Sequence, residues 1–464
     1  MARGSAFGRS RTHRGALLVA GVLLCGLASP APAARADSAT LSDPAEKVIE
    51  TVLENGLRVL TLEDHTTPIV SLQLWVQVGS KDESRYTGLA HLFEHMMFKG
   101  SKNVAPEVHA RLVEARGGRV NAFTSRDVTV YFEDVTAESL PLVIDLEAER
   151  FSNLVITEES LAPERQVVLE ERRMRVDDSA NGRGFEALMA LAWRANTYRW
   201  PVIGWPEDVQ KAPAEVCREF FETYYVPNNL ALVIVGDFET EATLAHVRRA
   251  FGSLVEREPI PRNPVRQPEQ AGGRRATVHF DVQGSLLFAA WHAPATGHAD
   301  AEALDVASQI LSGGRSSRLY RSLVYESEVA LSAHGGYWEL QEAGLFYAMA
   351  SVRPGASIEE AEALLFEQIA AIREEGVSAE EVEKAKRQLE VSLIEGLTTN
   401  HALAARIGRE TLAFGRVRPI AERLDAIRRV EVADVQRVAQ TWLQPEKRTV
   451  VQVVAPPPRE EGAP

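Results

Sequence analysis

The chain has 464 residues, which is enough for two domains with a hydrophobic core each, and its composition shows no collagen-like, low-complexity or disulfide-rich bias. Its net charge of −14 at pH 7 argues against nucleic acid and anionic membrane surfaces as partners. We therefore expect packed globular domains.

The first 36 residues have the pattern of a secretory signal peptide. Arginines precede the apolar run "ALLVAGVLLCGLA", and small residues follow it as far as Ala36. A transmembrane anchor is one alternative, but this run is shorter than the roughly 20 residues that span a bilayer. A lipid anchor on Cys25 is another, but bulky Leu24 precedes that cysteine. We expect an exported chain, periplasmic or secreted, without stable membrane insertion.

Processing after Ala36 would change the chemistry of the chain. It removes five arginines and no acidic residue, so the net charge falls from −14 to −19. Only Cys217 remains, which excludes an intramolecular disulfide and a cysteine-based zinc site. The hydrophobic cores must then stabilise the mature protein.

Residues 37–255 predict one module of strands and helices. Asn55-Gly56 lies between two alternating apolar runs and predicts a hairpin. Further along, the pattern predicts a strand over 68–80, a short helix at "HLFEHMMFKG", strands over 117–135, helices over 138–150 and 158–176, and a buried closing strand over 226–238.

Residues 276–464 repeat this order. The pattern predicts strands over 276–294, a helix over 299–314, a strand pair over 342–355, helices over 357–376 and 378–397, and a closing strand over 442–457. Residues 256–275 between the halves are rich in Pro, Arg and Gln and read as a linker. The fold class that we predict is α+β: two homologous α/β modules in tandem, each a mainly antiparallel sheet covered by helices.

Two histidines on the short helix of the first module suggest a metal site. His91 and His95 are four residues apart, which places both imidazoles on one helix face. Glu94 lies on the same side, close enough to reach a metal-bound water. A catalytic zinc needs a third protein ligand and an open fourth position. The alternative is a solvated helix face, because this motif also arises by chance.

The search for a third ligand leads to "PERQVVLEERRMRV". Glu164 and Glu171 are seven residues apart and therefore share one helix face. One of them could bind metal and the other could support it. Taken without the histidines, both would read as ordinary solvent contacts.

The second module provides an internal comparison. If Gly100 is laid on Gly313, His91 falls opposite Leu304, Glu94 opposite Ala307 and His95 opposite Ser308. If Thr157 is laid on Ser378, Glu164 falls opposite Ala385 and Glu171 opposite Ser392. The second copy keeps the helices but lacks the histidines and glutamates, which argues against a role of these residues in packing or solubility.

The stretch "TGLAHLFEHMMFKGS" resembles the inverzincin peptidases, the pitrilysin-type family that includes insulin-degrading enzyme and the mitochondrial processing peptidase. The resemblance covers essentially the whole mature chain, including "ERQVVLEE", "GGRVNAFTSRDVTVYF" and "YYVPNNLALVIVGDF". It implies a zinc metalloendopeptidase with one Zn²⁺ per chain.

The resemblance also assigns roles to residues. It implies His91, His95 and Glu171 as zinc ligands, Glu94 as general base and Glu164 as a supporting acid. Glu170 is the rival third ligand, on a different side of the helix if Glu164 faces the metal. The strand around Asn121 and Ala122 matches the edge to which a peptide substrate adds in β fashion, although an ordinary edge strand is the alternative.

One departure from the family concerns partners. The family's second half carries an arginine and, seven residues later, a tyrosine that face substrate; this chain has Val324 and Leu331 there. A zinc motif without that pair resembles the metal-bearing subunit of two-chain members. We therefore expect a heterodimer with a related chain lacking the zinc motif, or a homodimer in which the pair is dispensable.

The expected function is cleavage of peptides or unfolded polypeptides outside the cytoplasm. The main rival is a non-catalytic binding or scaffold subunit, which would have no need of the complete set of zinc residues. A zinc hydrolase acting on another substrate has only the generality of zinc chemistry in its favour.

Overall fold

The computed structural model describes residues 43–263 and 265–457 of the chain. The predicted signal peptide, residues 1–36, lies outside these ranges, and its removal stays a prediction. Among the helices in the described ranges, none combines the length and the apolar character needed to cross a membrane.

The first module contains a six-stranded sheet. Its strands are β1 (Ile49–Val52), β2 (Arg58–Glu63), β3 (Ile69–Val76), β4 (Arg119–Thr124), β5 (Thr129–Thr136) and β6 (Leu230–Gly236), in the spatial order β1-β2-β6-β3-β5-β4. Only the β2–β6 pairing is parallel. The predicted hairpin is confirmed as β1–β2, with Gly56 at a positive φ of 82° in its turn. Strand β4 is an edge of the sheet.

The described part of the first module also contains eight α-helices. They are α1 (Leu89–Met96), α2 (Val108–Glu114), α3 (Leu140–Asn153), α4 (Glu158–Arg172), α5 (Ala180–Ala192), α6 (Pro206–Lys211), α7 (Ala214–Tyr224) and α8 (Thr240–Phe251). The helix expected over 138–150 begins two residues later, at Leu140. The helix expected over 158–176 ends at Arg172 and continues as a π-helical turn, Arg173–Asp177.

The second module repeats the sheet without a counterpart of β1. Its strands are β7 (Arg274–His279), β8 (Leu286–Ala293), β9 (Ala330–Trp338), β10 (Gly344–Val352) and β11 (Thr449–Val454), in the order β7-β11-β8-β10-β9. Its helices are α9 (Ala301–Ser312), α10 (Ile358–Glu374), α11 (Ala379–Glu395), α12 (Asn400–Phe414), α13 (Ile420–Arg429) and α14 (Val432–Trp442).

The two sheets correspond strand for strand. The order β2-β6-β3-β5-β4 maps onto β7-β11-β8-β10-β9, and the single parallel pairing, β7 with β11, recurs at the same place. The predicted tandem of two α/β modules is confirmed. The strand pair expected over 342–355 is wrong: that stretch forms only β10, and its partner β9 comes from residues 330–338. The exact module boundaries stay a prediction.

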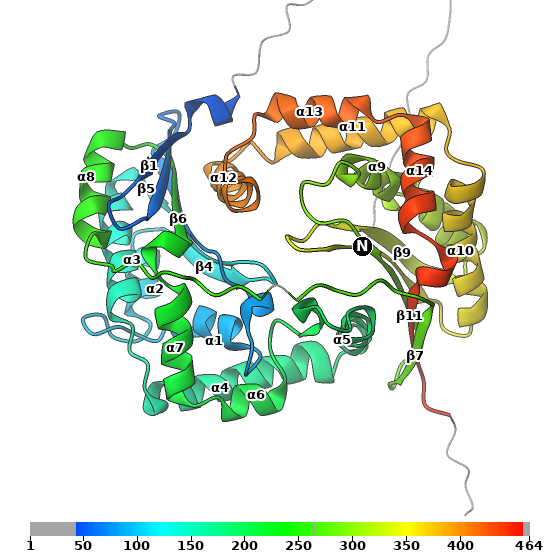
Figure 1. Ribbon diagram of the computed structural model, residues 1–464, viewed down its shortest axis with the longest axis horizontal. Helices are drawn as coiled ribbons and strands as arrows, with labels where there is room; N and C mark the ends of the chain where they lie inside the picture. Colours follow the sequence, from blue (N-terminus) through cyan, green and yellow to red (C-terminus); the bar gives the residue numbers. More distant parts are fainter. Residues whose placement is uncertain (1–42, 264, 458–464) are drawn as a thin grey trace, which may run out of the picture. The chain divides into compact units, whose positions relative to one another are not determined.

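One helix of each module packs against the sheet of the other module. Helix α5 packs against β8 and β11, and α12 packs against β3 and β6 (Figure 1). Glycines allow the close approach: a Cβ on Gly184 would lie 2.3 Å from the Phe288 ring, and one on Gly408 would lie 2.2 Å from the Trp75 ring. Packing of these helices therefore couples the two modules.

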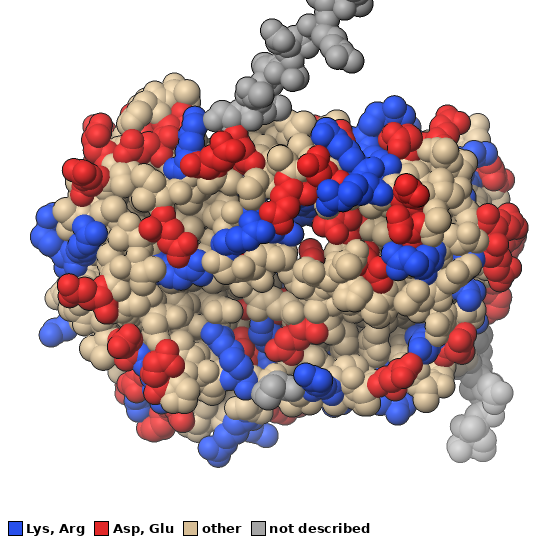
Figure 2. All heavy atoms as spheres, turned by 45° about the horizontal axis from the view of Figure 1, so that its top comes forward, with Lys and Arg blue, Asp and Glu red and all other residues tan. Residues whose placement is uncertain are grey.

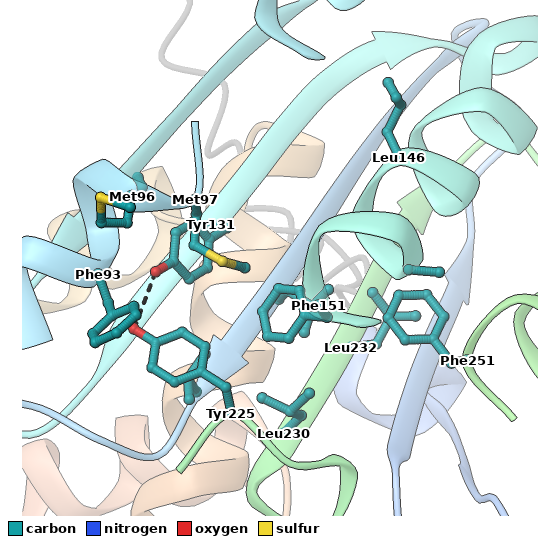
Figure 3. Packing of buried hydrophobic residues seen from close by; sticks show 14 of the residues in the cluster. Phe93, Met96, Met97, Tyr131, Leu146, Phe151, Tyr225, Leu230, Leu232 and Phe251 are labelled. Carbon is teal, nitrogen blue, oxygen red and sulfur yellow. Dashed lines mark hydrogen bonds between the residues drawn. The ribbon is translucent and has the colours of Figure 1, made fainter. Parts of the chain in front are cut away.

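Aromatic packing fixes helix α1 against the first module. Phe93 on α1 stacks with Phe220, at 5.8 Å between ring centroids, and also contacts Phe221 and Tyr225. Beside the Phe93 ring, the hydroxyls of Tyr131 and Tyr225 are 3.1 Å apart (Figure 3). All these rings except the half-buried Phe221 are buried, so the apolar face of α1 is anchored while its polar face is left for the histidines.

Charged side chains cover the surface in mixed sign. Figure 2 shows Lys and Arg side chains interspersed with Asp and Glu side chains over the face that it draws. On that face, the net negative charge of the chain is distributed among opposite charges rather than gathered in one block.

We predict that Gly408→Ala lowers the midpoint of thermal unfolding. The clash with Trp75 should cost about 1–3 kcal/mol, which outweighs the roughly 1 kcal/mol gained in helix propensity. Gly273→Ala is the matched control, because the nearest atom to its added Cβ is 3.6 Å away. Equal midpoints for both variants would contradict the close packing of α12.

Candidate active site

Helix α1 begins at a buried carboxylate. Glu83 accepts hydrogen bonds from the backbone N–H groups of Gly88, at 2.8 Å, and Ala90, at 2.9 Å. It thereby satisfies donors that a helix N-terminus leaves free. Gly88 has a φ of 87°, and a Cβ there would lie 2.8 Å from the backbone of Gly204. These contacts fix where α1 starts and hence where its histidines lie.

The two histidines and Glu171 come together as the spacing suggested. Glu171 Oε2 on α4 lies 3.7 Å from His91 Nε2 and 3.3 Å from His95 Nε2 on α1. One ligand atom from each of the three residues lies within 4.8 Å of the others. Two imidazole nitrogens and a carboxylate oxygen are a ligand set that zinc accepts. The residues present therefore fit a zinc ion.

Glu164 orients His95 from the other side. Its Oε1 lies 2.7 Å from His95 Nδ1, and its Oε2 lies 3.2 Å from Lys99 Nζ. Burial alone would lower the pKa of His95, but hydrogen bonds to Glu164 and Glu171 outweigh it and raise this pKa to about 9. Because Nδ1 is held by Glu164, Nε2 is the nitrogen that faces His91 and Glu171.

His91 has a drier environment than His95. It is buried, and its Nδ1 has no hydrogen-bond partner among the described residues. Burial, helped by the charge of His95, lowers the pKa of His91 to about 4. His91 is therefore neutral at pH 7, which is the protonation state that a metal ligand needs.

Glu94 lies beside this cluster and contacts the edge strand. Its Oε2 accepts a hydrogen bond of 2.6 Å from the Thr124 hydroxyl on β4. Burial raises the pKa of Glu94, and the bond from Thr124 opposes that rise. The sequence did not identify Thr124 as a site residue. It lies on the same face of β4 as Val120 and Ala122, because side chains two residues apart share a face of a strand.

Glu170 points away from the cluster. Its side chain is 55% exposed and pairs with Arg173, whereas the side chain of Glu171 is 18% exposed and meets both histidines. The geometry therefore separates the two adjacent glutamates and favours Glu171 as the third ligand.

A cavity of about 930 Å³ opens along the cluster. Strand β4, with Asn121 and Ala122, lines it together with parts of α1, α4 and α5. Ala122 is buried, and its backbone N–H donates to the Asn121 side-chain oxygen at 2.9 Å. Among the described strands, β4 is an edge of its sheet that runs next to Glu94, and the Asn121 side chain occupies one of its backbone N–H groups.

Three of the five counterpart positions in the second module are buried packing positions, whereas Ser392 is exposed. Leu304, Ala307 and Ala385 are buried, and the Ser308 hydroxyl donates to the Leu304 carbonyl at 2.8 Å. Val324 packs against the second core, and Leu331 on β9 is 55% exposed. None of these side chains can act as a charged contact to substrate.

A second group of potential metal ligands lies in the first module, but the guanidinium of Arg150 already occupies it. His109, Glu133 and Glu147 are buried with ligand atoms within 4.8 Å of one another. Arg150 donates to Glu147 at 2.8 Å and to Glu133 at 3.4 Å. The guanidinium offsets one carboxylate charge, and burial raises the pKa of Glu147 to about 8, so this group is a buried hydrogen-bonded network around Arg150.

Comparison with known proteins identifies the family of the chain. Residues 58–204 match the family described as Insulinase (Peptidase family M16), and residues 211–389 match the Peptidase M16 inactive domain. The chain is 29% identical to the zinc protease PqqE of Helicobacter pylori, over 86% of this chain and 91% of that protein. It is 30% identical to an uncharacterized zinc protease of Mycobacterium leprae, over 88% and 92% of the two chains.

A solved structure agrees as well. The crystal structure of a protease from Helicobacter pylori superposes with a TM-score of 0.85 at 28% identity, over 88% of this chain and 99% of that one. The metal-compatible cluster lies in the first matched region, and the second matched region lacks its counterpart. With two M16 modules in tandem and zinc proteases among its relatives, this chain belongs to the insulinase, or pitrilysin-type M16, peptidase family.

Proposed function

We propose that this protein is an exported zinc metalloendopeptidase that hydrolyses peptide bonds in peptides or unfolded polypeptides. The observation that carries the proposal is the convergence of His91, His95 and Glu171 with Glu94 beside them. In this proposal residues 1–36 are removed as a signal peptide, and residues 256–275 join modules 37–255 and 276–464.

His91, His95 and Glu171 would hold one zinc ion per chain. Bound zinc supplies Lewis-acid chemistry: it makes a water more acidic and polarises the scissile carbonyl. The neutral state of His91 and the orientation of His95 by Glu164 support these ligand roles. Because Glu94 is not one of these three ligands, its carboxylate would remain available for proton transfer.

Glu94 acts as the general base. It accepts a proton from the attacking water and returns that proton to the leaving amine. Its raised pKa suits both transfers, because a carboxylate in a dry site holds a proton more readily than one in water. The Thr124 hydroxyl holds Glu94 Oε2 and keeps the carboxylate beside β4.

The substrate would bind along β4. A free edge strand offers backbone N–H and C=O groups, so an extended peptide can add to the sheet by main-chain hydrogen bonds. Asn121 and Ala122 lie on this strand, and Thr124 at its end contacts Glu94. An extended peptide held there would present its backbone next to the general base.

A related chain would complete the active enzyme. Val324 and Leu331 stand where the family resemblance implies an arginine and a tyrosine, and neither can contact substrate through a charge or hydroxyl. In the heterodimer that we propose, a partner lacking the zinc motif supplies these contacts. The second candidate is a homodimer that does without them.

A non-catalytic scaffold remains the rival function. A scaffold has no need of three converging ligand atoms with the Glu94 carboxylate beside them at an edge strand, and such clusters of perturbed ionisable groups are typical of functional sites. The convergence of His91, His95 and Glu171 therefore favours the enzyme over the scaffold.

Glu94→Gln should abolish most turnover and leave zinc in place. Loss of the general base should lower kcat by about 100-fold or more. Zinc content by elemental analysis and cleavage of an unstructured peptide measure the two effects together. Wild-type cleavage by the Gln variant would overturn the role of Glu94.

Glu164→Gln should weaken zinc binding by about 10-fold, because His95 loses the charged partner that fixes its Nδ1. The affinity is measured by competition with a chelator. Glu170→Gln on the same helix is the control, since Glu170 is exposed and contacts Arg173 instead. An equal effect of the two variants would contradict the orienting role of Glu164.

The lone chain should cleave an unstructured peptide much more slowly than a complex reconstituted with a related, zinc-less chain. The rates are compared at equal zinc content, and the oligomeric state is measured by light scattering. Full activity of the chain alone would refute the heterodimer and, if it came from a dimeric species, favour the homodimer.

A further inference from the structure

Each carboxylate oxygen of Glu171, the proposed third ligand, has partners of its own. Glu171 Oε2 faces the two histidines, and Glu171 Oε1 accepts an ion-paired contact of 2.9 Å from Arg175 Nη1. Arg175 lies four residues after Glu171, in the π-helical turn Arg173–Asp177 that follows α4. Such turns within helices often occur at functional sites. The turn brings a cation to the back of the carboxylate.

Two independent contacts hold this turn in place. The buried Arg172 just before it donates to Glu186 on α5, at 2.7 and 3.0 Å, and to the Gly204 carbonyl at 3.1 Å. Gly182 on α5 lies so close that a Cβ there would come within 2.2 Å of the Arg175 carbonyl oxygen. The backbone of Arg175 is therefore fixed by α5, although its side chain is largely exposed.

Helix α5 is in turn the helix that packs on the sheet of the second module, against β8 and β11. The support of Glu171 thus runs from the second sheet through α5 and the π-helical turn to Arg175. The second module, which lacks ligands of its own, contributes in this way to the geometry of the cluster in the first.

We propose that Arg175 is a positioning residue for the metal site: it holds Oε1 of Glu171 so that Oε2 stays directed at His91 and His95. The inference rests on the proposed zinc function. A carboxylate with one oxygen fixed by a guanidinium offers only the other to a metal, and outer partners of this kind tune metal affinity.

The neighbouring Arg173 shows what an ordinary surface pair looks like in the same turn. Arg173 and Glu170 are 56% and 55% exposed, so their pair is open to water on both sides. Glu171, by contrast, is 18% exposed while Arg175 is 75% exposed. An exposed cation contributes little to folding stability, so the consequence of removing Arg175 should appear at the metal rather than in the fold.

The test compares R175Q with R173Q, its matched control, in the full mature chain. Zinc affinity is measured by chelator competition, and the melting temperature is measured on the metal-free proteins. We expect R175Q to bind zinc about 10-fold more weakly, R173Q to bind it as wild type does, and the metal-free melting temperatures to agree. R175K, which keeps a cation within reach of Glu171, should lose less affinity than R175Q.

A second readout reports the ligand geometry directly. The visible absorption of the Co²⁺-loaded protein should change in R175Q and not in R173Q, because it depends on how Glu171 meets the metal. Equal or tighter zinc binding by R175Q, or an equal loss in R175K, would overturn the role of Arg175. If wild type binds no zinc, the proposed function itself fails, and the two failures are thereby distinguished.

Discussion

The site depends on the contact between helices α1 and α4. His95 lies between the carboxylates of Glu164 and Glu171, both on α4. Glu164 is 69 residues further along the chain than His95. Two carboxylates in a partly buried place need positive charge nearby, and His95, Lys99 and Arg175 surround them. A divalent cation bound between the histidines would take the place of the His95 proton in this balance, because a histidine binds metal in its neutral form. Each oxygen of the two carboxylates already has a partner in this arrangement.

The tandem architecture makes this contact rigid. Helix α1 is fixed by aromatic packing below and by Glu83 at its start, while α4 continues into a turn seated on α5. Since α5 packs on the second sheet and α12 on the first, neither module presents a complete surface without the other. The degenerate second module therefore has a structural reason to persist, although it has no metal ligands of its own.

Local sequence patterns predicted the tandem of two modules, most of the strands, some of the helices and the side chains that converge at the candidate site. The spacing of His91 and His95, and of Glu164 and Glu171, places side chains on helix faces, and helix periodicity depends only on nearby residues. The sequence of elements along the second module followed from recognising the repeat, except that β9 lies before the stretch in which a strand pair was predicted. The choice of Glu171 rather than Glu164 as the third ligand came only from the resemblance, and the distances from Glu171 to the two histidines support it.

Other features depend on contacts between distant segments and could not be read from the sequence. Helices α5 and α12 were not predicted from the sequence, and their packing against the sheet of the other module depends on contacts between distant segments. Thr124 and Glu83 look like ordinary polar residues until the fold brings them to Glu94 and to the start of α1. The π-helical turn replaced the last turn of a predicted helix, since periodicity does not distinguish the two.

The most direct test of this account is the zinc content of the mature protein, measured by elemental analysis for wild type, Glu171→Gln and Glu170→Gln and coupled to cleavage of an unstructured peptide. The account predicts about one zinc per wild-type chain, retained in Glu170→Gln and lost in Glu171→Gln together with the cleavage. A well-folded wild-type protein that binds no zinc under metal-replete conditions would contradict it and favour a scaffold.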